Sequence, residues 1–445
     1  MRTGRVAIDG RIRRFRRREN LVSQDRPVPT LPDPKRRQDS GSATPRAQTE
    51  RPRSPHGWGL LALVIALCTV PALLAALKGA PYGAASFATN NSDALVFRSA
   101  AELLARGLSP YDARTLQEHI AQTRLDGRAP PYDLPFAYPP NALPMFALLL
   151  IGSPRFAFYL FLVLGTALML LSVYGIARRF CPQRTDALVV VLGAGLSGPT
   201  VFNGYLGQTG CYLAAAVFAY ALSYRTAPLR AGIALGLMAF KPQYALPLGI
   251  VALVQRRWQT VMAAAGTFLV CSLLSGALYG FDLWTQFAGA AGSFNHTLDH
   301  MCNWFAFAYA LVPESRAALH GAGLPVMFLG LLALAAYCRM DRDREDAGLR
   351  GLIVATALVP LISPNTHPYD LIVWILPVCA LASRRPRVPA GIVVCLFGLL
   401  ILLILVTGYR WILPLIGLVL VLLVARPARR SATMPIPSAV LEGNP

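Results

Sequence analysis

Long apolar runs separated by short polar loops fill the chain between residues 58 and 425. An α-helix needs about 20 apolar residues to cross the hydrocarbon core of a bilayer, and many of these runs approach that length. The pattern therefore predicts an all-α polytopic membrane protein with about twelve transmembrane helices. The predicted spans are 59–78, 156–177, 186–203, 209–223, 229–240, 242–254, 258–280, 323–338, 349–363, 368–382, 387–407 and 411–425.

Two further apolar runs, 140–152 and 303–313, are too short for a comfortable crossing. We interpret them as interfacial or re-entrant helices, which enter the membrane without spanning it. This choice puts every Arg-rich loop on one side, which the positive-inside rule identifies as cytoplasmic. Both termini are then cytoplasmic and the polar loops face the periplasm across the inner (plasma) membrane. It stays open whether residues 140–152 cross the bilayer. A crossing would place Arg178 and Arg179 on the periplasmic side, which the positive-inside rule disfavours, but a single loop can break that rule.

Composition agrees with a membrane protein and excludes two other classes. Hydrophobic residues make up 55% of the chain, charged residues only 14%, and the mean hydropathy is +0.47. The net charge of +20 lies largely in the first 57 residues and in short loops, so it does not indicate nucleic acid. The eight Cys residues are scattered without a CxxC pair, which argues against a disulfide framework or a zinc site.

The same features divide the chain into three parts. Residues 1–57 are rich in Arg, Pro, Ser and Gln, and we expect a disordered basic cytoplasmic tail there. Residues 58–426 form the predicted membrane domain, with an outer juxtamembrane region at 79–155. Residues 427–445 form a second cytoplasmic tail.

The first outer loop carries the leading catalytic candidate, Asp93. Apolar residues recur at helical spacing after it, so an amphipathic helix along the membrane surface is expected, with Asp93 at its start. A carboxylate in this position can act as a general base on an acceptor hydroxyl. A plain helix cap is an equally local explanation. A turn containing Tyr111 ends this helix, and Tyr138 then stands just before two prolines, either at the site or as an interfacial aromatic residue.

Polar residues in the later outer loops extend the list. Lys241 interrupts an apolar stretch before Pro242 and is expected either to bind a lipid phosphate or to snorkel to the interface. Asn203 and Gln208 flank a Gly-bearing bend, where amides can bind sugar hydroxyls or simply close a helix–helix turn. His367 and Asp370 stand at the start of an apolar run and can orient each other, bind phosphate or cap a helix. His296 and His300 lack an obvious third metal ligand, so no metal is expected.

These residues, taken in order, resemble glycosyltransferase family 87, also known as the DUF2029 membrane proteins. The resemblance runs from about Trp58 to Arg426 and rests on a series of short segments: Asp93, Tyr111, Phe136-Ala137-Tyr138-Pro139-Pro140, Gly207-Gln208, Lys241-Pro242, Asn295, and Ser363-Pro364 through His367-Pro368-Tyr369-Asp370-Leu371. It implies a GT-C-like bundle with its active site on the non-cytoplasmic face. It also implies a polyprenyl-phosphate sugar donor, often polyprenyl-phosphate mannose, with Asp93 as the base and His367 as a further catalytic residue. The Asn295-His296-Thr297 segment departs from the family pattern, which leaves the role of Asn295 open.

The resulting expectation is an inverting transfer of a sugar from a polyprenyl-phosphate carrier to a glycan or glycolipid acceptor. Lys241, Arg98 or Arg410 would offset the charge of the departing phosphate, and no cofactor is expected. The alternative is a transporter or flippase of lipid-linked sugars, although no internal repeat typical of transporters is evident. A non-catalytic membrane scaffold would give no reason for polar motifs to gather on one face.

Overall fold

The computed structural model describes residues 93–123, 136–181, 183–290, 301–312, 316–341, 346–384 and 388–426, the side chains of 316–320 excepted. All of these residues belong to the unit Pro55–Pro445. Both predicted tails, the first predicted span, Asn295, His296 and His300 lie outside the described residues. The domain limits at 57 and 426 therefore stay predictions.

Every regular element in the described ranges is a helix, which confirms the all-α class. The predicted spans coincide with helices or helix pairs; the predicted span 258–280, for example, is α12. The helices that correspond to predicted spans are α6 (Pro154–Phe180), α7 (Arg184–Gly195), α8 (Gly198–Leu206), α9 (Gly210–Ser223), α10 (Pro228–Leu237) with η4 (Met238–Phe240), α11 (Pro242–Val254), α12 (Trp258–Tyr279), α15 (Arg316–Met340), α16 (Ala347–Ile362), η8 (Pro368–Trp374) with α17 (Ile375–Ala382), α18 (Ala390–Thr407) and α19 (Leu413–Ala425).

Four helices in the described part of the chain are long and apolar enough to cross a membrane alone: α6, α12, α18 and residues 321–340 of α15. The pair α7 and α8 makes a fifth if its 44° bend lies within one span. The remaining apolar helices have 10–17 residues. The total of about twelve spans therefore stays a prediction.

Small residues allow close helix packing, as is common in membrane bundles. A Cβ added to Gly232 of α10 would lie 2.4 Å from the Cβ of Ala263 in α12, and one added to Gly236 would lie 2.6 Å from that of Thr267. Helix α10 therefore packs against the N-terminal half of α12.

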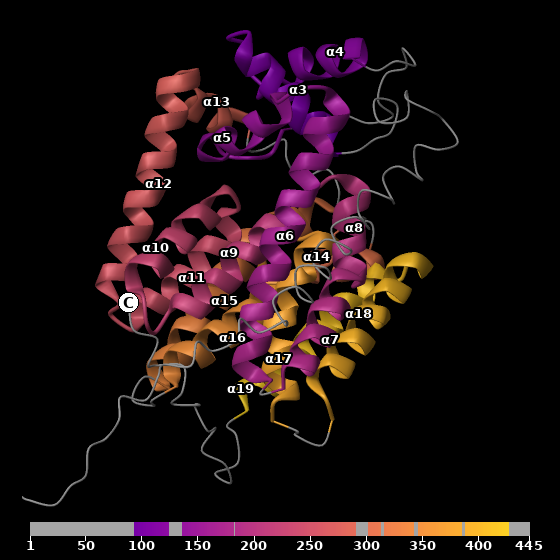
Figure 1. Cartoon of the computed structure of the whole chain (residues 1–445). Coiled ribbons are helices and arrows are strands. Elements are labelled where there is room, and N and C mark those ends of the chain that lie inside the picture. The colour runs from indigo at the N-terminus through magenta and orange to yellow at the C-terminus, as the bar shows by residue number, and fades with distance from the viewer. Residues whose placement is uncertain are drawn as a thin grey trace, which may run out of the picture. The chain divides into compact units, whose positions relative to one another are not determined.

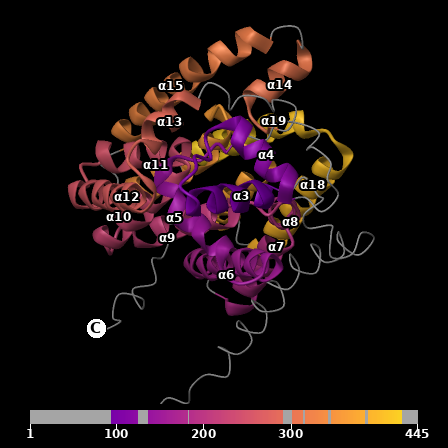
Figure 2. The ribbon, with the colours of Figure 1, turned by 90° about the horizontal axis from the view of Figure 1, so that it is seen from above.

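The described part of the region predicted as the outer juxtamembrane loop consists of short helices at one end of the bundle. They are α3 (Asp93–Ala105), α4 (Ala113–Thr123), η2 (Pro140–Ala142), α5 (Leu143–Phe146) and η3 (Ala147–Leu150), and they lie near α13 (Leu283–Ala290) (Figure 1). Seen from above, α3 and α4 lie over the middle of the view, with α6, α12, α15 and α18 around them (Figure 2). Helix α3 is described from Asp93 onward, within the range predicted to be helical, and most of its residues are buried. It packs against α4, α5 and η3 and is not a helix with one free amphipathic face.

Candidate active site

The turn between α8 and α9 positions the first part of the site. Gly207 ends α8 in the left-handed region, with φ of 70°. The N–H groups of Gly207 and Gln208 donate to the carbonyl groups of Gly204 and Asn203, which is the Schellman arrangement. A Cβ on Gly207 would lie 2.5 Å from the Cβ of Ala94, so the start of α3 rests directly on this turn.

A chain of hydrogen bonds runs from this turn to Asp93, and we refer to it as the Asp93 chain. Gln208 donates from Nε2 to Oδ2 of Asp93 over 2.5 Å. The Oε1 atom of Gln208 accepts from the Tyr138 hydroxyl at 3.2 Å and from the Thr209 backbone N–H at 3.2 Å. The Tyr138 and Thr209 hydroxyls are 2.7 Å apart. Because two N–H or O–H groups donate to Oε1, this atom must be the amide oxygen, and the NH₂ end of Gln208 faces Asp93. Gln208 therefore orients the carboxylate.

Tyr138 is buried at the centre of this chain. Its backbone carbonyl accepts from the Tyr111 hydroxyl at 2.8 Å, which ties the two predicted tyrosines together. Burial raises the pKa of the Tyr138 hydroxyl well above its usual range, and the negative charges of Asp370 and Asp93 raise it further. The hydroxyl therefore stays protonated as a donor, and both carboxylates lie near it.

Lys241 and Asp370 form the second part of the site, the Lys241–Asp370 pair. Nζ of Lys241 lies 2.5 Å from Oδ1 of Asp370, and the exposed fractions of the two side chains are 7% and 1%. Nζ also lies 4.8 Å from the centre of the Tyr369 ring. Lys241 therefore does not snorkel to an interface, since its charge is enclosed and balanced by a carboxylate.

His367 stands beside this pair. Its backbone N–H donates to Oδ2 of Asp370 at 3.3 Å, and its half-buried ring stacks on Tyr369 with centroids 5.3 Å apart. Asp370 thus closes the start of η8 and holds Lys241 with its other oxygen. Helix capping, one of the explanations that the sequence left open for Asp370, therefore applies, and the ion pair with Lys241 is a role that the sequence did not predict.

The two parts of the site meet at η8. A Cβ on Gly210 would lie 2.5 Å from the Tyr369 carbonyl oxygen, so the α8–α9 turn rests on the backbone of η8. The Tyr138 ring stacks on Phe240, the residue before Lys241, with centroids 6.3 Å apart. The structure therefore brings Asp93, Tyr138 and Gln208 close to Lys241, His367 and Asp370, which lie far from them in sequence.

The other predicted residues have different surroundings. Arg98 lies five residues after Asp93, roughly 140° further round the helix. It pairs with Glu102 at 2.7 Å and donates to the Leu149 carbonyl oxygen at 2.7 Å. These contacts hold α3 to η3, so Arg98 serves the packing of these short helices.

Asn203 and Arg410 both lie at α8. Oδ1 of the buried Asn203 accepts from the Cys211 backbone N–H at 3.3 Å, the contact expected of a residue that closes a helix–helix turn. The Arg410 guanidinium, in η9 (Arg410–Ile412), lies 5.7 Å from the centre of the Phe202 ring. Arg410 therefore brings a cation to α8, the helix that precedes Gln208.

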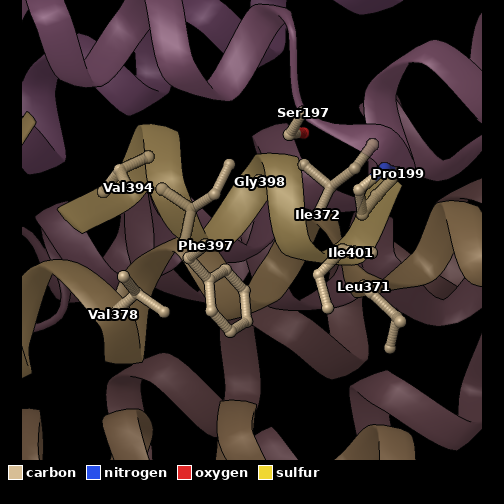
Figure 3. A pocket seen from close by; sticks show the side chains of 10 residues that line it. Ser197, Pro199, Leu371, Ile372, Val378, Val394, Phe397, Gly398 and Ile401 are labelled. Carbon is tan, nitrogen blue, oxygen red and sulfur yellow. The ribbon is translucent and has the colours of Figure 1, made fainter. Parts of the chain in front are cut away.

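A small, narrow apolar cavity lies between the α7–α8 bend, η8–α17 and α18 (Figure 3). Its lining is aliphatic or aromatic apart from Ser197. The Ser197 hydroxyl donates to the Ala194 carbonyl oxygen at 2.9 Å. With its one hydroxyl engaged in this way, the cavity is unsuited to a sugar and lies next to the site without belonging to its chemistry.

Sequence reasoning missed Thr209 and Tyr369. Thr209 follows Gln208 directly and completes the hydrogen bonding of Tyr138. Tyr369 lies between His367 and Asp370 and contacts both the histidine ring and the lysine charge. Tyr369 stands inside a segment that the sequence had already marked and Thr209 directly after one, but no local pattern distinguishes their roles.

The apolar helices and the enclosed polar site define a helical membrane protein. The family model for glycosyltransferase family 87 matches residues 136–364, more than half of the 445 residues. The chain therefore belongs to glycosyltransferase family 87, and its membership implies a membrane glycosyltransferase with a sugar donor and an acceptor. The matched range includes Tyr138, Gln208 and Lys241 and leaves out Asp93 and His367. A comparison with curated proteins gives no match.

Proposed function

We propose that this glycosyltransferase moves a sugar, with inversion, from a polyprenyl-phosphate carrier to a glycan or glycolipid acceptor on the periplasmic side of the inner membrane. The observation that carries the proposal is the Asp93 chain, in which a buried amide and tyrosine orient a half-buried carboxylate. The sequence resemblance supplies the donor class, and the loop charges supply the side of the membrane. Family membership favours transfer over the transport alternative.

Asp93 is the proposed general base. A carboxylate offers about four acceptor positions, so Asp93 can hold the Gln208 amide and still receive the proton of an acceptor hydroxyl. The deprotonated oxygen attacks the anomeric carbon from the face opposite the phosphate, the bond to the phosphate oxygen breaks, and the polyprenyl phosphate leaves with the electron pair. Gln208 acts as a positioning residue, since it touches the base directly.

The departing phosphate needs a positive counterpart. Lys241 is proposed for this role: an ammonium group has three donors, and the bond to Asp370 uses one of them. Arg410 is the second candidate, because it reaches α8 from η9. Arg98 is less suitable, since Glu102 and the Leu149 carbonyl group occupy its guanidinium. His367, beside Asp370, is proposed to contact the phosphate or the acceptor.

The test is a transfer assay with right-side-out and inverted membrane vesicles, a labelled polyprenyl-phosphate sugar and an acceptor that cannot cross the membrane. Asp93→Asn should lower transfer by about 10²–10⁴-fold while the protein folds normally. Asp112→Asn is the matched control: Asp112 is an exposed aspartate of the same outer region that caps α4 through the Arg114 and Thr115 N–H groups. An active, well-folded Asp93→Asn variant would refute the mechanism, and transfer only in inverted vesicles would refute the proposed side.

A further inference from the structure

Three enclosed oxygen atoms on η2, α12 and α13 have no hydrogen-bond partner in the described part of the chain. They are Oδ1 of Asn141 in η2, Oγ of Ser275 in α12 and Oε1 of Gln286 in α13. Asn141 is 8% exposed and Ser275 is fully buried. Buried polar groups in native proteins nearly always have partners, so three orphans in one region call for a ligand.

Neighbouring residues satisfy the same kinds of group within the protein. On α12 itself, the Thr267 and Ser272 hydroxyls donate to the carbonyl groups one turn earlier, at 2.9 and 2.8 Å, and Ser275 does not. The buried amide of Asn303 donates to the Ser363 carbonyl oxygen at 2.8 Å and accepts from the Ala306 N–H. Residue type and position on a helix therefore do not by themselves account for the three orphans.

The three residues come from elements that contact one another. Both α12 and α13 contact η2. Because α10 packs on the N-terminal half of α12, the burial of Ser275 near the other end must come from other elements. Both η2 and α5 contact α12, and the ring of Phe281 lies against Gly276, the residue after Ser275.

This region adjoins the Asp93 chain. Asn141 follows Tyr138 by three residues. Phe287, next to Gln286, lies 5.5 Å from Tyr111 between ring centroids, and Tyr111 donates to the Tyr138 carbonyl group.

We propose that Asn141, Ser275 and Gln286 form a subsite for the hydroxyl groups of a sugar. The amide oxygens of Asn141 and Gln286 only accept hydrogen bonds, and the serine hydroxyl both donates and accepts. A ligand that satisfies all three must offer several donors and at least one acceptor, as a row of sugar hydroxyls does. Acceptor oxygens disfavour a phosphate, so this subsite is distinct from the one for the leaving group. The assignment rests on the proposed function only for its position beside the catalytic base.

The experiment titrates the purified full chain with methyl α-mannoside and methyl α-glucoside and follows binding by ligand-observed NMR. Ser275→Ala and Asn141→Leu should each weaken binding of the preferred glycoside by about tenfold. Ser272→Ala and Thr267→Val are the matched controls on the same helix and should bind as the wild type does. Unchanged binding in the Ser275→Ala and Asn141→Leu variants, or no binding of either glycoside by the wild type, would overturn the proposal.

Thermal unfolding supplies a second readout. Removal of an orphaned group should leave the melting temperature of Asn141→Leu unchanged or higher, whereas Asn303→Leu, which breaks the hydrogen bonds to Ser363, Ala306 and Met301, should melt lower. A comparable fall for Asn141→Leu would mean that its amide is structural and would refute the subsite.

The Asp93→Asn variant separates this proposal from the proposed function. It should bind the glycoside normally, because Asp93 does not belong to the subsite. If Asp93→Asn stays active while Ser275→Ala loses glycoside binding, the catalytic proposal fails and the subsite stands. In the transfer assay, an increase in KM for the donor or for the acceptor identifies which substrate carries the bound sugar.

Discussion

Removing the charges of Lys241 and Asp370, one at a time and then together, gives the sharpest test of the site. The two side chains form an ion pair with 2.5 Å between Nζ and Oδ1, and both are enclosed. Removing one partner of a buried pair leaves an uncompensated charge and typically costs about 3–5 kcal/mol. We therefore expect Lys241→Met and Asp370→Asn each to lose about that much free energy of unfolding.

The double variant should behave differently. With both charges removed, the remaining cost is that of one imperfectly satisfied amide, about 1–2 kcal/mol, because the amide oxygen introduced by Asp370→Asn can still accept from the His367 N–H. The double variant should thus be more stable than either single variant, which a double-mutant cycle measures as a coupling of several kcal/mol. The assay is denaturation of the purified full chain in mixed detergent micelles, together with transfer activity.

Activity distinguishes a structural role from a role with the donor. If Lys241 offsets the phosphate charge, the double variant recovers stability but not transfer. Recovery of both would restrict the pair to a structural role. A double variant no more stable than the single variants would show that the two charges do not depend on each other and would refute the reasoning.

Two further predictions concern the turn that carries Gln208. Gly207→Ala should lose about 2–4 kcal/mol of unfolding free energy and much of the transfer activity, because it strains a left-handed backbone and drives a methyl group into Ala94. Gly107→Ala, at a φ of 71° with open space around it, should lose only about 1 kcal/mol, and equal losses would contradict the packing argument. Gln208→Glu should move the acidic limb of the pH–rate profile upward by about 1–3 pH units, because a second carboxylate beside Asp93 disfavours the ionised base. An unchanged profile would mean that Gln208 does not position the base.

The sequence by itself determined the class of the protein and the location of its helices. The length and period of an apolar run are local properties, so α12 could be placed almost to the residue from the run at 258–280. The helical character of α3 follows from the same local pattern. The sequence also marked the segments that carry the site, through polar residues at positions where an apolar run is interrupted.

Only the tertiary structure decided which polar residues meet. Gln208 and Asp93 are 115 residues apart, and Lys241 and Asp370 are 129 apart, so no local pattern could pair them. The surroundings of α3 were likewise decided by the fold. This helix was expected on the membrane surface, and it is largely buried because α4, α5 and η3 pack around it. Ser275 looks like any serine in an apolar helix until its neighbours are in place. Hydrogen bonds and charges act over a few ångströms in space, and the fold, not the order of the residues, sets those distances.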